Sequence, residues 1–165
     1  MVEIEQILES NEKYSNDFKY GTLSSSPTRK LAILACMDTR IIVENVLGLS
    51  VGEAHVIRNA GGIATDDAIR SLIISHELLG TNAFIVLNHT ECGLLKSTDK
   101  EFQKKLTEKY KSDASTMKFY FFPNLEQNVR EQVDRIKSSP FLSPEISVVG
   151  FIYDVRTGKL IRVSD

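Results

Sequence analysis

The chain has 165 residues, of which 42% are hydrophobic, and carries 20 Lys and Arg against 22 Asp and Glu. A chain of this length forms one domain that buries about two-thirds of its unfolded surface, and we expect residues 1–165 to be a single domain. The formal net charge of −2 gives no reason to expect a nucleic acid or an anionic membrane as partner, so we expect a small-molecule substrate.

Residues 1–20 are predicted to form an N-terminal helical arm. Ile4, Leu8 and Phe18 are spaced among charged residues, as in an amphipathic helix that lies on another surface. The acidic start lacks the positive charge and continuous apolar stretch of a secretory signal, which favours a cytoplasmic location. The apolar runs are too short to cross a bilayer, so we do not expect a membrane protein.

Two short apolar runs predict strands that are covered on both faces. Residues 31–35 precede Cys36, and residues 83–87 precede His89. The other elements are predicted as helices at 41–47, 65–79, 99–110 and 123–138, strands at 54–58 and 146–153, and an antiparallel edge strand at 159–163. Because strands and helices alternate, the fold class is α/β, with a mostly parallel sheet flanked by helices.

Chemically active side chains follow two of these strands. Cys36 ends one, and His89 and Cys92 follow another, so two thiols and an imidazole are expected at neighbouring strand ends. These are ligand types that suit Zn²⁺, and catalytic zinc sites usually keep three protein ligands and one exchangeable position. The sequence therefore predicts Zn²⁺ as the cofactor.

Asp38 and Arg40 follow the first of these ligands and can form an ion pair. Arg40 would keep Asp38 ionised and oriented toward the metal or its bound water. In one state, Asp38 is the fourth ligand and closes the site. In the other state it turns to Arg40 and leaves the fourth position to water, and we hypothesise a pH-dependent switch between the two.

Simpler interpretations exist for each of these residues. A buried free cysteine is often a small core residue, and Cys36 and Cys92 could instead form a redox pair, although they lack a local C-x-x-C spacing. His55 and His76 are interpreted as structural histidines. Two adjacent glycines at 61 and 62 are interpreted as a turn or a close backbone approach, because the P-loop lysine pattern is missing.

The ordered motifs resemble the β-class carbonic anhydrases, in particular their compact microbial branch. The resemblance spans about residues 31–93 and consists of the motifs Cys36-x-Asp38-x-Arg40, Gly52-Glu53-Ala54, Arg58-Asn59-Ala60-Gly61 and His89-x-x-Cys92-Gly93. It implies that the protein is a zinc lyase that hydrates carbon dioxide reversibly to bicarbonate and a proton.

The resemblance also implies roles for individual residues. Cys36, His89 and Cys92 would bind zinc, Asp38 and Arg40 would form the gating and orienting pair, and the backbone N–H of Gly93 would contact a substrate oxygen. Members of the family form dimers or multiples of dimers, often through the N-terminal helix, which implies a homodimer or higher homo-oligomer.

Two other functions are compatible with the same residues. Relatives of this family hydrolyse carbon disulfide or carbonyl sulfide, and the sequence does not separate those substrates from carbon dioxide. A non-catalytic zinc protein would keep Asp38 as a permanent fourth ligand, although structural zinc sites more often use four Cys or His ligands.

Overall fold

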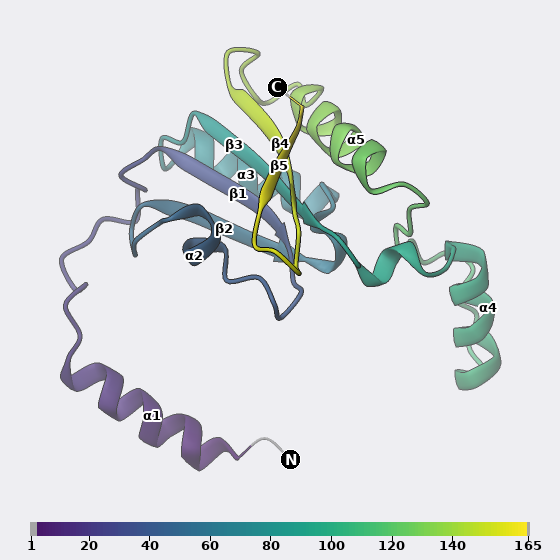
Figure 1. Cartoon of the computed structure of the whole chain (residues 1–165), viewed down its shortest axis with the longest axis horizontal. Helices are drawn as coiled ribbons and strands as arrows, with labels where there is room; N and C mark the ends of the chain where they lie inside the picture. The colour runs from purple at the N-terminus through teal and green to yellow at the C-terminus, as the bar shows by residue number, and fades with distance from the viewer. Residues whose placement is uncertain (1–2, 165) are drawn as a thin grey trace.

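The computed structural model describes residues 3–164 and contains a five-stranded sheet flanked by helices (Figure 1). The elements in chain order are α1 (Ile4–Asn16), β1 (Leu31–Cys36), α2 (Val43–Leu47), β2 (Ala54–Asn59), η1 (Ala60–Gly62), α3 (Asp66–Glu77), β3 (Ala83–His89), η2 (Gly93–Leu95), α4 (Asp99–Tyr110), α5 (Leu125–Lys137), β4 (Ser147–Tyr153) and β5 (Leu160–Ser164). The strand order is β2-β1-β3-β4-β5, and the β4–β5 pair is antiparallel whereas the other pairs are parallel. The predicted α/β class and the antiparallel edge strand are confirmed.

Some helices and strands begin or end a few residues away from the predicted positions. The helix expected from residue 41 begins at Val43, because the Ile41 N–H donates to the Asp38 carbonyl in a turn and the Ile41 side chain enters the core. The helix expected from Pro123 begins after Asn124, whose side chain accepts from the Gln127 N–H and caps it. Strand β3 continues two residues past the predicted end and includes His89.

The central strands are apolar because helices cover both faces of the sheet. On one face, Ala32 and Leu34 pack with α3 and α5, and Leu72 of α3 is fully buried there. On the other face, Ile33 and Ala35 pack with residues of α2. Figure 1 shows α2 and α3 on opposite sides of the sheet. This alternation along β1 explains why the sequence shows an unbroken apolar run rather than a period of two.

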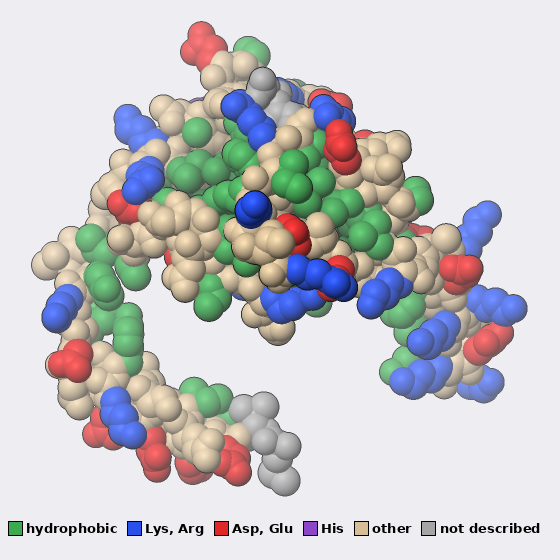
Figure 2. Space-filling model, viewed as in Figure 1, with side chains coloured by type: hydrophobic (Ala, Val, Ile, Leu, Met, Phe, Trp, Pro, Cys, Tyr) green, Lys and Arg blue, Asp and Glu red, His purple; other side chains and the backbone are tan. Residues whose placement is uncertain are grey.

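Helix α1 projects away from the sheet as an arm (Figure 1). None of its residues 4–16 is buried, and the side chains of Ile4, Leu8 and Phe18 are each at least half exposed, at 59%, 62% and 50%. Figure 2 shows apolar side chains along the inner side of the arm and acidic ones along its outer side. The predicted amphipathic helix is present, but the rest of the described chain leaves its apolar side exposed. Among residues 3–164, no helix is both long and apolar enough to span a membrane.

The parallel strands place two chain segments at one edge of the sheet. Strands β1 and β3 are neighbours in register, with Ala35 opposite Leu87, so β1 ends at Cys36 beside the end of β3 at His89. The carboxyl ends of parallel strands are the usual location of ligand sites in open α/β sheets. The predicted site residues follow these two ends.

Candidate metal centre

The structure brings together the three residues predicted to bind a metal. The side-chain ligand atoms of Cys36, His89 and Cys92 lie within 4.8 Å of one another. All three residues are buried, with exposed fractions of 4%, 0% and 3%. Three soft or borderline ligand atoms at this spacing, shielded from bulk water, could hold one metal ion.

The imidazole of His89 is oriented so that one nitrogen faces the cluster as an acceptor. Its Nδ1 lies 2.8 Å from the carbonyl oxygen of Thr90, which cannot donate, so Nδ1 carries the proton. The other nitrogen, Nε2, is buried and meets the geometric criteria for a hydrogen bond with none of residues 3–164. A buried nitrogen without a partner is costly unless it binds something, and a backbone bond at Nδ1 is the usual support of a metal-binding histidine.

The two buried thiols differ in acidity because each acts on the pKa of the other. A hydrogen bond from Cys92 lowers the pKa of Cys36 to about 4, against the opposing effect of burial, with further help from His89 and from backbone N–H groups. One of these groups is the Gly61 N–H, which lies 3.3 Å from Cys36 Sγ. The same shared hydrogen bond, together with burial, raises the pKa of Cys92. Burial would lower the pKa of His89, but the Cys36 thiolate reverses this and raises it.

These properties fit a zinc ion better than an apolar core. An inert core cysteine has a raised pKa, as Cys92 has, whereas the pKa of Cys36 is lowered by the adjacent Cys92 and His89 side chains. Two sulfurs and one imidazole nitrogen match the ligand preference of Zn²⁺ and could supply three of the four ligands of a tetrahedral site.

Asp38 and Arg40 form a close ion pair beside the cluster. The Arg40 side chain donates to both carboxylate oxygens of Asp38, from Nε at 2.9 Å and Nη2 at 2.8 Å, and its backbone N–H adds a third bond at 3.0 Å. These hydrogen bonds hold the pKa of Asp38 well below its usual range and raise the pKa of Arg40. Asp38 Oδ2 lies 3.7 Å from His89 Nε2, so the carboxylate borders the cluster.

Arg58 fixes the loop that carries this pair. Its Nε donates to the Cys36 carbonyl at 3.1 Å and its Nη2 to the Asp38 carbonyl at 2.7 Å. The motif containing Arg58 was identified in the sequence, but its contact with the loop depends on the parallel pairing of β1 with β2. Arg58 therefore supports the backbone of the site from the neighbouring strand.

Glu91 and Arg156 complete the polar surroundings, and neither was predicted to have a role. Glu91 accepts from Arg40 Nη1 at 3.2 Å and from Arg156 Nε, and these contacts, Arg156 first, lower its pKa. The only sequence signal for Glu91 was its position next to Cys92. No signal in the sequence pointed to Arg156, because the turn between β4 and β5 is what brings it close to Glu91.

The paired glycines provide the close backbone approach predicted for them. Gly61 and Gly62 have φ values of 83° and 61°, in the left-handed region. A Cβ atom on Gly62 would lie 2.6 Å from Asn88 Oδ1 and 3.0 Å from the Cys36 backbone nitrogen. The glycines thus let η1 pack directly against the end of β1, where the Gly61 N–H reaches the Cys36 sulfur.

The other two histidines lie outside the cluster, as predicted. His55 Nδ1 lies 2.7 Å from Ser75 Oγ and its Nε2 lies 2.9 Å from the Ser25 carbonyl, so it connects β2 to α3 and to an earlier loop. His76 contacts the Thr81 carbonyl through Nδ1. These bonds satisfy both side chains within the fold.

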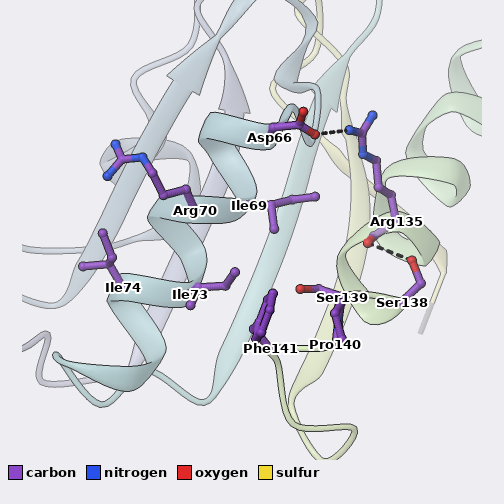
Figure 3. Close-up of a pocket in the computed structure, with 10 residues that line it drawn as sticks. All are labelled: Asp66, Ile69, Arg70, Ile73, Ile74, Arg135, Ser138, Ser139, Pro140 and Phe141. Carbon is purple, nitrogen blue, oxygen red and sulfur yellow. Dashed lines mark hydrogen bonds and ion pairs between the residues drawn. The ribbon is translucent and has the colours of Figure 1, made fainter.

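A groove of about 510 Å³ lies away from the cluster, between α3 and the segment that follows α5 (Figure 3). Ile69, Ile73 and Phe141 form its apolar wall, and an ion pair of 2.7 Å joins Arg135 to Asp66 at one end. None of the three predicted metal ligands lines this groove. It therefore adds no group to the candidate centre.

Comparison with known proteins decides the family. The model of the carbonic anhydrase family matches residues 31–160. The chain belongs to the β-carbonic anhydrase family. It is 43% identical over 164 residues to β-carbonic anhydrase 1 of Mycobacterium tuberculosis, with 99% of each chain covered.

Two further relatives of this β-carbonic anhydrase bear on its fold and chemistry. A crystal structure of carbonic anhydrase from Streptococcus mutans superimposes with a TM-score of 0.94 at 40% identity, covering 99% of both chains. Carbon disulfide hydrolase of Saccharolobus solfataricus is 32% identical over 181 residues, covering 95% of this chain and 89% of the relative. Membership of the family makes the protein an enzyme of the lyase class.

Proposed function

We propose that the protein hydrates carbon dioxide reversibly to bicarbonate and a proton, with one Zn²⁺ bound by Cys36, His89 and Cys92. The observation that carries the proposal is the buried cluster of these three residues, in which His89 Nε2 has no hydrogen-bond partner in the described part of the chain. Similarity across the whole chain to proteins named carbonic anhydrase supports the choice of reaction.

The side chains around the cluster suit this reaction. Zinc, when bound, would act as a Lewis acid that makes water a nucleophile near neutral pH. Arg40 occupies both oxygens of Asp38, which keeps the carboxylate ionised and turned toward the arginine. An ionised Asp38 can only accept hydrogen bonds, so it would orient the O–H of a water molecule next to the cluster. The three proposed ligands are themselves buried, which limits the access of bulk solvent to them.

Gly93 is the proposed substrate-binding residue. It directly follows Cys92 at the start of η2, and a Cβ atom added there would meet no atom within 4 Å. A small substrate could therefore approach its backbone closely. The Gly93 N–H would donate to an oxygen of carbon dioxide as negative charge develops on that oxygen.

The direct test is stopped-flow measurement of carbon dioxide hydration by the zinc-loaded protein at alkaline pH. We expect hydration far above the uncatalysed rate, and we expect Asp38→Ala to lose most of it while its zinc content stays at that of the wild type. Wild-type protein with full zinc and no hydration would contradict the proposal. An active Asp38→Ala variant would remove the role given to Asp38.

Hydrolysis of carbon disulfide or carbonyl sulfide is the second candidate, favoured by the similarity to carbon disulfide hydrolase. We rank it second because the identity is 32%, against 43% for a carbonic anhydrase. Release of hydrogen sulfide from either compound, faster than hydration of carbon dioxide, would reverse the ranking. A non-catalytic zinc protein is disfavoured because it would need Asp38 as a permanent fourth ligand. Both carboxylate oxygens of Asp38 instead accept hydrogen bonds from Arg40.

The proposed assembly is a homodimer or higher homo-oligomer of this single domain. The support is α1, whose apolar side chains are exposed along one side of the arm (Figure 2). Exposed apolar surface of this kind normally marks an interface. Residues 1 and 2 of the predicted arm lie outside the described residues. Light scattering coupled to size exclusion should give at least twice the 18.5 kDa mass of one chain, and Leu8→Asp should reduce it.

A further inference from the structure

Glu91 connects two arginines that come from distant parts of the chain. Arg40 Nη1 donates to its Oε2 at 3.2 Å, and Arg156 Nε donates to its Oε1. Each carboxylate oxygen of Glu91 thus receives a different guanidinium group. Because Arg40 also holds Asp38, the four side chains form a continuous series, Asp38–Arg40–Glu91–Arg156, that ends beside the metal cluster.

Glu91 anchors the Asp38–Arg40 pair to the other half of the site. Asp38 and Arg40 are only two residues apart, so the hydrogen bonds between them fix their mutual orientation within one loop. They do not by themselves fix the position of that loop relative to β3. Glu91 lies between His89 and Cys92 in the sequence, so its bond to Arg40 ties the pair to the segment that carries two of the proposed metal ligands.

Arg156 is presented to Glu91 by a firmly held turn. The Arg156 N–H donates to Asp154 Oδ1 at 2.9 Å, and the Gly158 N–H donates to the Asp154 carbonyl at 2.8 Å. Thr90 connects this turn to the metal-ligand segment, because its Oγ1 accepts from the Val155 N–H at 3.1 Å. Glu91 itself, two residues past the end of β3, has a left-handed backbone with φ of 59°, which is uncommon for a residue other than glycine.

We propose that Glu91 and Arg156 are positioning residues, which hold Arg40 so that Asp38 keeps a fixed placement relative to the metal ligands. Neither touches the substrate in this account. The inference rests on the proposed function for its kinetic consequence. Its geometric part, the placement of Asp38 beside the metal, can be measured independently of turnover.

The expected effects are modest because the ion pairs are exposed to solvent. The side chains of Arg156, Glu91 and Arg40 are 79%, 40% and 42% exposed. Exposed ion pairs contribute little individually, so we expect Arg156→Ala and Glu91→Gln each to lower kcat by about two- to five-fold. KM should stay unchanged, since neither side chain binds substrate.

The experiment compares wild-type protein, Arg156→Ala, Glu91→Gln and the double variant. Two quantities are measured at one fixed pH: the kinetics of the zinc-loaded enzymes, and the visible absorption of the Co²⁺-substituted proteins. Arg130→Ala is the matched control, because Arg130 holds an exposed ion pair of 2.8 Å with Glu126 on α5, away from the cluster. All variants should retain one metal ion per chain.

We expect Arg156→Ala and Glu91→Gln to change the Co²⁺ spectrum in the same sense, because Asp38 moves relative to the metal, while Arg130→Ala leaves it unchanged. The double variant should be no worse than Glu91→Gln alone, because Arg156 acts through Glu91. Spectra and kcat equal to those of Arg130→Ala, or additive losses in the double variant, would overturn the inference. If wild-type enzyme hydrated no carbon dioxide, the proposed function would fail, and the spectra would still decide the positioning.

Discussion

Replacing Gly62 by alanine should destabilise the fold at the edge of the metal cluster. Gly62 has a left-handed backbone, with φ of 61°, and a Cβ atom there would lie 2.6 Å from Asn88 Oδ1, 3.0 Å from the Cys36 nitrogen and 3.2 Å from the Ala35 carbonyl carbon. Two of these atoms belong to the backbone of β1 and cannot rotate away. The substitution therefore combines backbone strain with steric overlap.

The two effects can be separated by a second glycine. Gly48, at the end of α2, has nearly the same φ of 62°, but a Cβ atom there would meet nothing within 4 Å. Left-handed backbone costs an L-residue about 1–2 kcal/mol, and overpacking costs about 1–3 kcal/mol more. We therefore expect Gly48→Ala to lower the free energy of unfolding by about 1–2 kcal/mol and Gly62→Ala by about 2–5 kcal/mol.

Urea unfolding of the metal-free variants, followed by circular dichroism, measures this difference as a shift in midpoint at constant slope. Because the overlap falls on the Cys36 backbone, Gly62→Ala should also bind zinc more weakly than Gly48→Ala, as measured by competition with a chromophoric chelator. Equal losses of stability in the two variants would show that the close approach of η1 to β1 contributes nothing, and would refute the reasoning.

Three further predictions concern stability and use the same urea assay. Burial would raise the pKa of Asp99, but bonds from the backbone N–H groups of residues 119–121 lower it. The stability that Asp99 contributes is therefore fully present above its pKa in the unfolded chain, which is about 3.9. It is lost as the pH falls through the lower pKa that Asp99 has in the folded protein. Asp99→Ala should lower the free energy of unfolding by about 1–3 kcal/mol at neutral pH and by progressively less in acid. A loss that is the same at every pH would contradict this. Thr98→Ala should cost about 1 kcal/mol, because Thr98 forms the capping box of α4, and an unchanged midpoint would contradict that role. Leu72→Ala should cost about 2–5 kcal/mol and Leu78→Ala less than about 0.5 kcal/mol, since their exposed fractions are 0% and 75%; similar losses would contradict the burial pattern.

The fold and the centre of the site could be predicted from the sequence because both depend on local patterns. An unbroken apolar run such as residues 31–35 predicts a strand covered on both faces, and β1 confirms it. Cys36 and His89 end two such strands, and neighbouring parallel strands bring their ends together. Residue type and position along the strand were therefore enough to predict that Cys36, His89 and Cys92 meet.

The surroundings of the site could not be predicted because they depend on contacts between distant segments. Arg156 is 65 residues from Glu91, and the two meet only because β4 pairs with β3 and turns into β5 beside the metal-ligand segment. Similarly, the Asp99 carboxylate accepts hydrogen bonds from the backbone N–H groups of residues 119–121, some twenty residues later in the chain. No periodicity or motif records such pairs. The amphipathic pattern of α1 likewise does not specify what its apolar side packs against.

X-ray absorption spectroscopy at the zinc edge tests the central claim most directly. We predict one zinc ion per chain with two sulfur ligands at about 2.3 Å and a histidine nitrogen at about 2.0–2.1 Å, and the loss of one sulfur ligand in Cys36→Ser. Protein that binds no zinc, or binds it through oxygen and nitrogen alone, would contradict the account of this site.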